Sequence, residues 1–352
     1  MKLLTYLGPD PDPQIGVLID GGASVAALQA GALAMEGMPR PYFRDMLSFL
    51  REGAAAKYKV HVLADYIASQ RPPGCVLGID DVKVLAPVPC PESIRDCMAF
   101  EDHVINATRV VGLGRLAPLD EALERWLGRE HSIAYALNRA WYKRPLYYKS
   151  NRFSVVGPDA PVQIPAYSKA FDYELEWGVV IGQEGRNIRE GDARDHIAGY
   201  TIFNDFSARD VQFQEMSGRL GPAKGKDFDT GNAMGPWLVT PDQLSNPYRL
   251  EMAARVNGEE WSRGSTADMH WSFEQIISYI SRSETLYPGE FIASGTCSGK
   301  RGRGCGLELG RTLKPGDVVE LEVEGIGTLR NKVTAATTEA PRRPRLERAQ
   351  RV

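Results

Sequence analysis

FDYELEWGVVIG, residues 171–182, is an apolar run that carries two carboxylates, Glu174 and Glu176. Its valines, isoleucine and leucine favour a β-strand. Side chains at positions i and i+2 of a strand lie on the same face, so these acids would lie side by side among apolar neighbours. Two adjacent buried anions repel each other unless a cation lies between them. The run therefore predicts either a strand with one solvated face or, with support from other segments, part of a divalent metal site.

The apolar runs and turn residues around this stretch predict an α+β fold, because strands and helices do not alternate regularly. Strands are expected at 173–182 within this run and at 153–156, 198–204, 237–240, 249–257, 290–294 and 317–324, and helices at 43–52, 119–127 and 272–282. We expect a small β-rich N-terminal domain over residues 1–88 and a larger domain over 94–338. The charged, proline-bearing tail 341–352 is expected to be disordered.

Bulk composition excludes several classes of protein. The 352 residues carry a net charge of -3, which gives no reason to expect binding to nucleic acid or to an anionic membrane. The five cysteines are irregularly spaced and show neither a CxxC zinc pattern nor a disulfide framework. We find no signal peptide and no apolar stretch of about 18 residues, the length that a membrane helix needs. A reduced, cytoplasmic protein is the expectation.

A second group of polar residues follows an apolar strand in NDFSARDVQ (204–212). Asp205 would lie at the end of that strand, and Arg209 and Gln212 follow at helical spacing. A carboxylate, a guanidinium and an amide on one face can bind an anionic, oxygen-rich substrate. The same residues also suit an ordinary surface helix.

Glycines and lysines are mixed in GPAKGKDFDTG (221–231). Such a loop lets the backbone approach a ligand while Lys224 or Lys226 supplies positive charge. It is not a P-loop, because Asp227 stands where that motif needs serine or threonine. A flexible surface loop is the alternative.

The segment DCMAFEDHV (96–104) places Asp96 seven residues before His103, the one histidine with an acidic approach and an apolar continuation. In IASGTCSGKRGRGCGLELG (292–310), Glu308 lies between two leucines, on an exposed strand face or facing inward. A histidine paired with a buried glutamate is a general-base arrangement, in which the acid fixes the imidazole tautomer.

Together these motifs resemble the fumarylacetoacetate hydrolase family. The resemblance runs from about Ile94 to Val333 and rests on several motifs in family order. These are PLYYKSNRFSVVGPDAPVQIP (145–165), DYELEWGVVIG (172–182), GYTIFNDFSARDVQ (199–212), KGKDFDTGNAMGPWLVT (224–240), ARVNGE (254–259), PGEFIASGTCSG (288–299) and LKPGDVVELEVEGIGTLRNKV (313–333).

The resemblance implies a mixed β-roll catalytic domain over residues 94–338, preceded by the small N-terminal domain, and it assigns roles to particular residues. The implied metal ligands are four acids and, for a second, structural cation, one hydroxyl: Asp96, Glu174, Glu176, Asp205 and Thr230. The implied catalytic residues are His103, Glu308, Lys226, Arg209 and Gln212. The implied substrate-binding residues are Met98, Met216, Thr296 and Lys149. Carboxylate ligands suit Mg²⁺, Ca²⁺ or Mn²⁺ better than zinc.

Two departures from the fumarylacetoacetase-type pattern bear on the substrate. Met98 and Met216 each stand where that pattern has a tyrosine, which implies a more apolar pocket. The substrate is therefore expected to differ from fumarylacetoacetate itself. The segment 105–144 matches the family poorly and can shape or cover the site.

The implied function is hydrolysis of a C–C bond in a β-diketone, either acylpyruvate-like or fumarylacetoacetate-like, as in aromatic catabolism. The reaction would use a metal-chelated enolate and a water molecule activated by His103 and Glu308. The alternative within the family is a metal-dependent decarboxylase, isomerase or dehydratase of a 2-oxo acid. A non-catalytic binding protein on the same scaffold is the alternative from another class. Resembling members are commonly homodimers, so a homodimer is expected.

Overall fold

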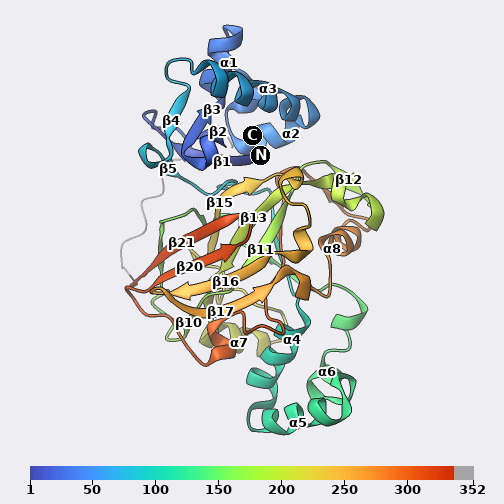
Figure 1. Ribbon diagram of the computed structural model, residues 1–352. Coiled ribbons are helices and arrows are strands. Elements are labelled where there is room, and N and C mark those ends of the chain that lie inside the picture. The colour runs from blue at the N-terminus through green and yellow to red at the C-terminus, as the bar shows by residue number, and fades with distance from the viewer. Residues whose placement is uncertain (337–352) are drawn as a thin grey trace.

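The computed structural model describes residues 1–336, and its largest feature is a long central sheet (Figure 1). The strands of this sheet are β1 (Lys2–Leu7), β2 (Gln14–Ile19), β3 (Ser24–Ala27), β4 (Val76–Gly78), β5 (Lys83–Val84), β6 (Ile94–Cys97), β7 (Tyr147–Ser150), β8 (Val155–Val156), β11 (Glu176–Ile181), β13 (Ile197–Asp205), β15 (Asn232–Val239) and β19 (Phe291–Ala293). Their order is β4-β3-β2-β1-β15-β13-β11-β19-β6-β7, with β5 beside β1 and β8 beside β15.

A second sheet packs against the central one. Its strands are β9 (Pro161–Gln163), β16 (Glu251–Val256), β17 (Glu259–Ser265), β20 (Val318–Val323) and β21 (Gly327–Thr334). Their order is β17-β16-β20-β21-β9. Two short pairs complete the strands of the described residues: β10 (Phe171–Asp172) with β14 (Ser207–Ala208), and β12 (Gly185–Arg186) with β18 (Thr285–Leu286).

The α-helices lie outside the sheets (Figure 1). They are α1 (Leu28–Glu36), α2 (Met46–Glu52), α3 (Ala54–Gln70), α4 (Glu101–Ala107), α5 (Ala117–Leu127), α6 (Ile133–Leu137), α7 (Arg209–Ser217), α8 (Phe273–Ile280) and α9 (Gly306–Leu309). Among residues 1–336, no helix combines the length and the apolar character that crossing a membrane requires.

Strand β11 is buried along its whole length because it separates two hydrophobic cores. Val179 packs in one core with Leu321 of the second sheet, whereas Val180 packs in the other core with Leu63 of α3. A strand that is covered on both faces needs apolar residues at every position. This explains why β11 is continuously apolar from Trp177 to Ile181, after the acids that alternate with apolar residues before it.

The structure confirms the α+β class and differs from expectation at the N-terminus. Residues 1–88, expected to be β-rich, form five short strands but also α1, α2 and α3, which together hold more residues than those strands. The long helix α3 was not predicted, although Val60, Leu63 and Ile67 recur at helical spacing on its buried face. Strand β1 pairs with β15, so the N-terminal strands continue the central sheet. The tail 341–352 lies outside the described residues.

Candidate active site

Four buried carboxylates converge where several strands of the central sheet end. Asp96 comes from β6, Glu176 begins β11, Glu174 precedes it, and Asp205 ends β13. One carboxylate oxygen each of Asp96, Glu174 and Asp205 lies within 4.8 Å of the others. Glu176 accepts a hydrogen bond from the backbone N–H of Gly295 at 3.0 Å. Burial is the main reason that its pKa is raised, and the nearby charges of Asp96 and Glu174 raise it further. We call these four residues the acid cluster.

The acid cluster has the properties of a site for a hard divalent cation. Among the described residues, no hydrogen-bond partner meets Asp96 Oδ1, Glu176 Oε1 or Asp205 Oδ1, although all three atoms are buried. Burial, followed by repulsion from neighbouring acids, raises the pKa of Asp96 and Glu176. Unpartnered buried oxygens are costly, and Mg²⁺, Ca²⁺ and Mn²⁺ bind such oxygens in proteins. The residues present therefore fit the divalent cation that the sequence predicted.

Two buried cations lie against the acid cluster. Lys226 Nζ is 2.6 Å from Asp205 Oδ2 and 3.0 Å from Glu174 Oε2. Burial alone would lower the pKa of Lys226, but these two carboxylates outweigh it, and the net shift is upward. Arg209 Nη1 is 2.7 Å from Glu174 Oε1 and donates to Gln212 Oε1 at 3.0 Å. The structure thus brings these three predicted catalytic residues together beside the acids.

Tyr148 is a site residue that the sequence analysis missed. Its hydroxyl donates to Asp96 Oδ2 at 3.0 Å and also contacts Asp205. Lys149, which was predicted to bind substrate, is exposed. In the antiparallel pairing of β6 with β7, Lys149 lies opposite Arg95, whereas Tyr148 lies opposite Asp96. Adjacent residues of a strand point to opposite faces, so Lys149 points away from the site. The structure therefore places Lys149 away from the acids, and its neighbour Tyr148 faces them.

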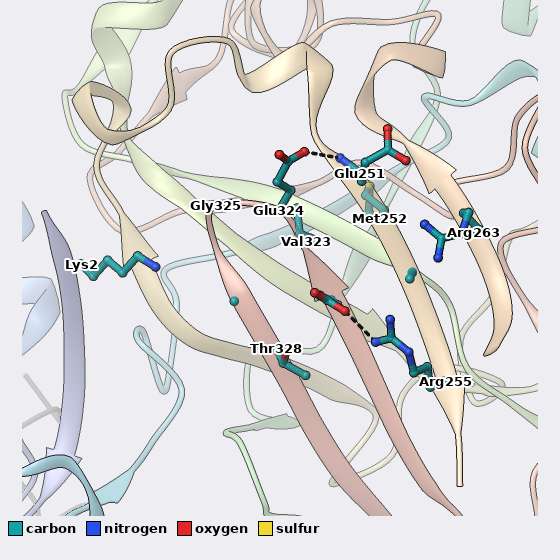
Figure 2. A pocket seen from close by; sticks show the side chains of 12 residues that line it. Lys2, Glu251, Met252, Arg255, Arg263, Val323, Glu324, Gly325 and Thr328 are labelled. Atoms are coloured by element: carbon teal, nitrogen blue, oxygen red, sulfur yellow. Dashed lines mark hydrogen bonds and ion pairs between the residues drawn. The ribbon is translucent and has the colours of Figure 1, made fainter. Parts of the chain in front are cut away.

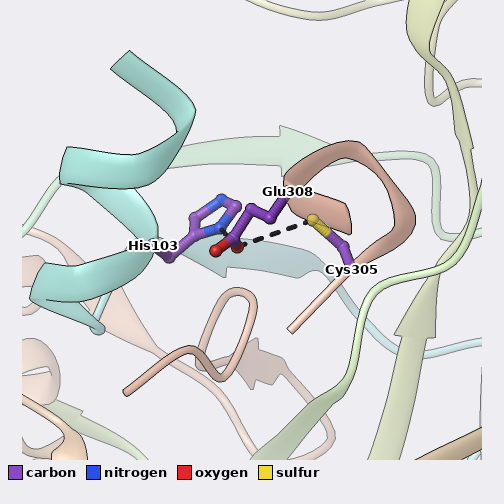
Figure 3. A group of neighbouring side chains, drawn as sticks. All are labelled: His103, Cys305 and Glu308. Carbon is purple, nitrogen blue, oxygen red and sulfur yellow. Dashed lines mark hydrogen bonds and ion pairs between the residues drawn. The ribbon is translucent and has the colours of Figure 1, made fainter. Parts of the chain in front are cut away.

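His103 and Glu308 form a buried pair next to the acid cluster (Figure 3). His103 Nδ1 on α4 lies 2.7 Å from Glu308 Oε1 on α9. Glu308 also accepts hydrogen bonds from Ser298 Oγ at 2.6 Å and Asn106 Nδ2 at 2.8 Å. Burial raises the pKa of Glu308, but His103 and these donors outweigh it and hold the pKa below its usual range. Because Nδ1 faces Glu308, Nε2 is the nitrogen left to exchange protons with a substrate.

Asp172 is a second residue that the sequence analysis did not single out. Its buried carboxylate accepts the backbone N–H groups of Gly306 at 2.8 Å and Leu307 at 2.9 Å, at the start of α9. It also accepts Arg209 Nε at 2.8 Å. Asp172 therefore links Arg209, beside the acid cluster, to the short helix that carries Glu308.

The remaining predicted site residues differ in how close they come to the acids. Thr296 is buried, and its hydroxyl has no partner among the described residues, while Met98 is half-buried. Met216, predicted to make the substrate pocket more apolar, is 50% exposed on the last turn of α7. The Thr230 hydroxyl accepts the backbone N–H of Gln163 on β9 at 2.8 Å. That bond joins the loop 221–231 to the second sheet. Thr230 is not one of the residues that converge in the acid cluster.

The segment 105–144, which matched the family poorly, continues α4 and projects from the body with α5 and α6 (Figure 1). Arg129 in this segment binds Asp102 at 2.6 Å and Glu101 at 3.1 Å, both on α4 immediately before His103. Its Nε also binds Glu124 of α5 at 2.8 Å. The projecting helices are thereby fastened to the helix that carries His103.

A groove of about 400 Å³ lies away from these residues, on the strands β16, β17 and β20 (Figure 2). Arg255 binds Glu322 at 2.6 Å, and the backbone N–H of Glu251 donates to Glu324 at 3.1 Å. None of the acid cluster, His103 or Glu308 lines this groove. Its size alone therefore does not make it the active site.

Comparison with known proteins identifies relatives over nearly the whole chain. The family model described as Fumarylacetoacetate (FAA) hydrolase C-terminal matches residues 121–334. The chain is 32% identical over 337 residues to mitochondrial oxaloacetate tautomerase FAHD2A of Bos taurus, covering 95% of this chain and 91% of that protein. The Homo sapiens protein of the same name is 31% identical over 335 residues, with 95% and 91% covered.

A solved structure has the same fold. It is a fumarylacetoacetate hydrolase from psychrophilic Exiguobacterium antarcticum, with a TM-score of 0.70 and 25% sequence identity. The similarity covers 96% of this chain and 100% of that one.

Proposed function

The chain belongs to the fumarylacetoacetate hydrolase family, and on that premise we propose that it is a metal-dependent enzyme that interconverts the keto and enol forms of a small 2-oxo diacid such as oxaloacetate. The observation that carries this proposal is a buried His103–Glu308 pair beside carboxylates with unpartnered oxygens. The Bos taurus and Homo sapiens relatives that align with 95% of the chain are named oxaloacetate tautomerases, which supports the choice of substrate class.

The acid cluster would hold the metal, for which we propose Mg²⁺, with Mn²⁺ or Ca²⁺ as substitutes. When bound, the cation would supply Lewis-acid polarisation of adjacent carbonyl and carboxylate oxygens. Lys226 and Arg209 hold the acids in place and keep positive charge next to the substrate oxygens. That charge favours the form of the substrate in which negative charge develops on oxygen.

His103 moves the proton in this proposal. Its Nε2 takes a proton from the carbon next to the keto group. The C–H electrons form the enol double bond, the π electrons of the carbonyl bond move to its oxygen, and the proton is returned to that oxygen; the reverse reaction uses the same steps. Glu308 keeps the other imidazole proton on Nδ1 and stabilises the imidazolium while it exists. The pair is already assembled in the structure, so its formation requires no large rearrangement.

Hydrolytic C–C cleavage of a β-diketone is the second candidate, because the same geometry favours it. His103 Nε2 can take a proton from water instead of carbon, and the water oxygen then forms a bond to the distal carbonyl carbon while the carbonyl π electrons move to its oxygen. The C–C bond breaks as that carbonyl re-forms, which leaves a carboxylic acid and an enolate that is protonated. The solved relative at 25% identity is named a fumarylacetoacetate hydrolase. Both reactions pass through an enolate, so the substrate decides between them.

A substrate panel tests the proposal. Purified protein with Mg²⁺ is assayed for oxaloacetate tautomerisation, oxaloacetate decarboxylation, acylpyruvate hydrolysis and 2-hydroxydienoate isomerisation, with and without chelator. We expect chelator-sensitive oxaloacetate tautomerisation. Chelator-sensitive cleavage of acylpyruvates with no tautomerisation would replace the first candidate with the second, and turnover of none of these substrates would reject both.

Substitution of the base separates chemistry from binding. General acid–base catalysis contributes about 10²–10⁴-fold, so His103→Ala should lose roughly that factor in kcat. Glu308→Gln keeps the shape but favours the wrong tautomer, and should also reduce kcat. His131→Ala is the matched control, because that histidine is 57% exposed on another helix. Full activity in His103→Ala would remove the assigned base.

We also propose that the enzyme works as a cytoplasmic homodimer. Light scattering of the full chain measures the assembly, and cell fractionation measures the compartment. The relatives named above are designated mitochondrial, so fractionation distinguishes this protein from them.

A further inference from the structure

Cys305 lies beside the His103–Glu308 pair and has no role in the proposed reaction (Figure 3). Its Sγ is 3.6 Å from Glu308 Oε1. One ligand atom each of His103, Cys305 and Glu308 lies within 4.8 Å of the others. Figure 3 shows His103 reaching this point from α4, while Cys305 and Glu308 reach it from one turn around α9. An imidazole nitrogen, a thiol and a carboxylate therefore meet at one buried point.

This donor set differs in kind from the acid cluster. Oxygen ligands alone suit Mg²⁺, Ca²⁺ and Mn²⁺, whereas one sulfur, one nitrogen and one oxygen suit zinc, which binds them at about 2.0–2.3 Å. The two groups are neighbours, because Glu174 of the acid cluster and Cys305 form an isolated antiparallel β-bridge. A hard cation such as Mg²⁺ can thus bind the acid cluster while zinc binds the adjacent group of His103, Cys305 and Glu308.

We infer that His103, Cys305 and Glu308 form a second metal site, selective for Zn²⁺ and similar borderline ions, whose occupation switches the enzyme off. Three protein ligands leave a fourth zinc position for water or a substrate oxygen. The binding claim depends on these three side chains alone. The inhibition claim rests on the proposed function, because it takes His103 to be the base.

Inhibition follows from the tautomer of His103. Because the Glu308 carboxylate can only accept a hydrogen bond, we assign the proton of neutral His103 to Nδ1, which leaves the electron pair on Nε2. Zinc would form bonds to Nδ1, to Cys305 Sγ and to a Glu308 oxygen. The thiol proton leaves to solvent, and the imidazole stays neutral with its proton moved to Nε2. That nitrogen then has no electron pair to accept a proton, so the base is lost.

The surroundings of the three ligands are compatible with a bound ion. Asn106 and Ser298 donate to Glu308 and can keep its carboxylate oriented, as outer-shell partners of metal ligands do. Two positive charges are nearby. Arg209 acts on the Cys305 thiol and is held by Asp172, and Arg303 has its Nη1 3.9 Å from Glu308 Oε2 on a side chain that is 41% exposed and can turn toward solvent. Access is through His103, whose side chain is 11% exposed while that of Glu308 is fully buried.

Cobalt reports directly on the thiol ligand. The full chain is first saturated with Mg²⁺ and then titrated with Co²⁺, and the near-ultraviolet thiolate-to-cobalt charge-transfer band is recorded. We expect a band that saturates at one equivalent, is absent in Cys305→Ser, and persists in the control Cys90→Ser, another buried free cysteine. No band in the native chain, or a band that survives Cys305→Ser, overturns the site.

Zinc titration measures affinity and inhibition together. In calorimetry of the Mg²⁺-loaded protein, with buffers of different ionisation enthalpy, one proton should be released per zinc. Cys305→Ser should weaken zinc binding at least about tenfold, since even outer-shell changes cost about 10–100-fold. Activity should fall as the site fills. Zinc binding that depends on Cys305 and leaves activity intact overturns the inhibition and the role of His103 as base, whereas an active enzyme without this binding overturns only the zinc site.

Discussion

The substitution Asp96→Asn gives the sharpest test of the metal centre. It keeps the size of the side chain and removes one negative charge from the acid cluster. Asp96 Oδ1 is buried and has no partner among the described residues, so the native carboxylate gains its main favourable contact when a cation binds. The variant should therefore lose most of the stabilisation that Mg²⁺ gives, without becoming less stable in the absence of metal.

The size of the effect follows from linkage. Ligand at one hundred times its Kd stabilises the folded state by about 2.7 kcal/mol. Unfolding entropy of about 2.1 cal/mol/K per residue amounts to about 0.7 kcal/mol/K for 352 residues. Saturating Mg²⁺ should therefore raise the Tm of the native chain by about 4 °C.

Differential scanning fluorimetry over a Mg²⁺ series measures the Tm shift of the native chain and that of Asp96→Asn. The control is Asp195→Asn, an exposed acid, which should keep the native response. A full Mg²⁺ shift in Asp96→Asn would place the cation elsewhere. A loss of about 3–5 kcal/mol in metal-free Asp96→Asn would mean instead that this carboxylate is a paired structural group.

Three further predictions concern residues around the site. Lys226→Met removes the buried cation that contacts both Glu174 and Asp205 within 3.0 Å, and it should cost about 3–5 kcal/mol in urea unfolding, with exposed Lys332→Met as the unaffected control. Gly295→Ala should destabilise by more than about 1 kcal/mol in the same assay, because φ is +76° there and a Cβ would come within 2.0 Å of the Cys97 carbonyl oxygen. Burial lowers the pKa of His270, so the folded state resists protonation and the free energy of unfolding should fall as pH drops below the ordinary histidine value of 6.5. His270→Phe should flatten this acid side of a Tm–pH profile. An unchanged profile would exclude His270 as the cause of the acid destabilisation.

Much of the fold could be predicted because its central strands are unusually apolar. Residues 198–204 and 173–182 were predicted as strands, and β13 and β11 lie within one to three residues of those bounds. The helix α3 was missed although its buried residues Val60, Leu63 and Ile67 show helical spacing, and its charged residues between them obscured the pattern. An apolar run was therefore enough to predict an element that is buried on both faces, whereas an element with one face of mixed apolar and charged residues was missed.

Site residues could be predicted only where a motif marked them. Tyr148 was missed because nothing local distinguishes it from Lys149; the pairing of β7 with β6 decides which of them faces Asp96. That pairing joins segments about fifty residues apart and is set by register, where a slip of one residue reverses every side chain. Cys305 is one of five cysteines for which the sequence showed neither a zinc pattern nor a disulfide framework, and only the fold shows that its thiol lies next to Glu308.

The stretch FDYELEWGVVIG positions both halves of the site, which its sequence shows only in part. Asp172, Glu174 and Glu176 alternate with apolar residues, so all three carboxylates lie on one face while the alternate residues enter the hydrophobic core. Two of these acids belong to the acid cluster, and Asp172 holds the helix that carries Glu308. One short segment thus fixes the distance between the metal ligands and the partner of His103. A shift of this segment would disturb the metal ligands and the position of Glu308 together. The alternation of acidic and apolar residues that begins at Asp172 was the sequence signal that could have revealed the role of Asp172.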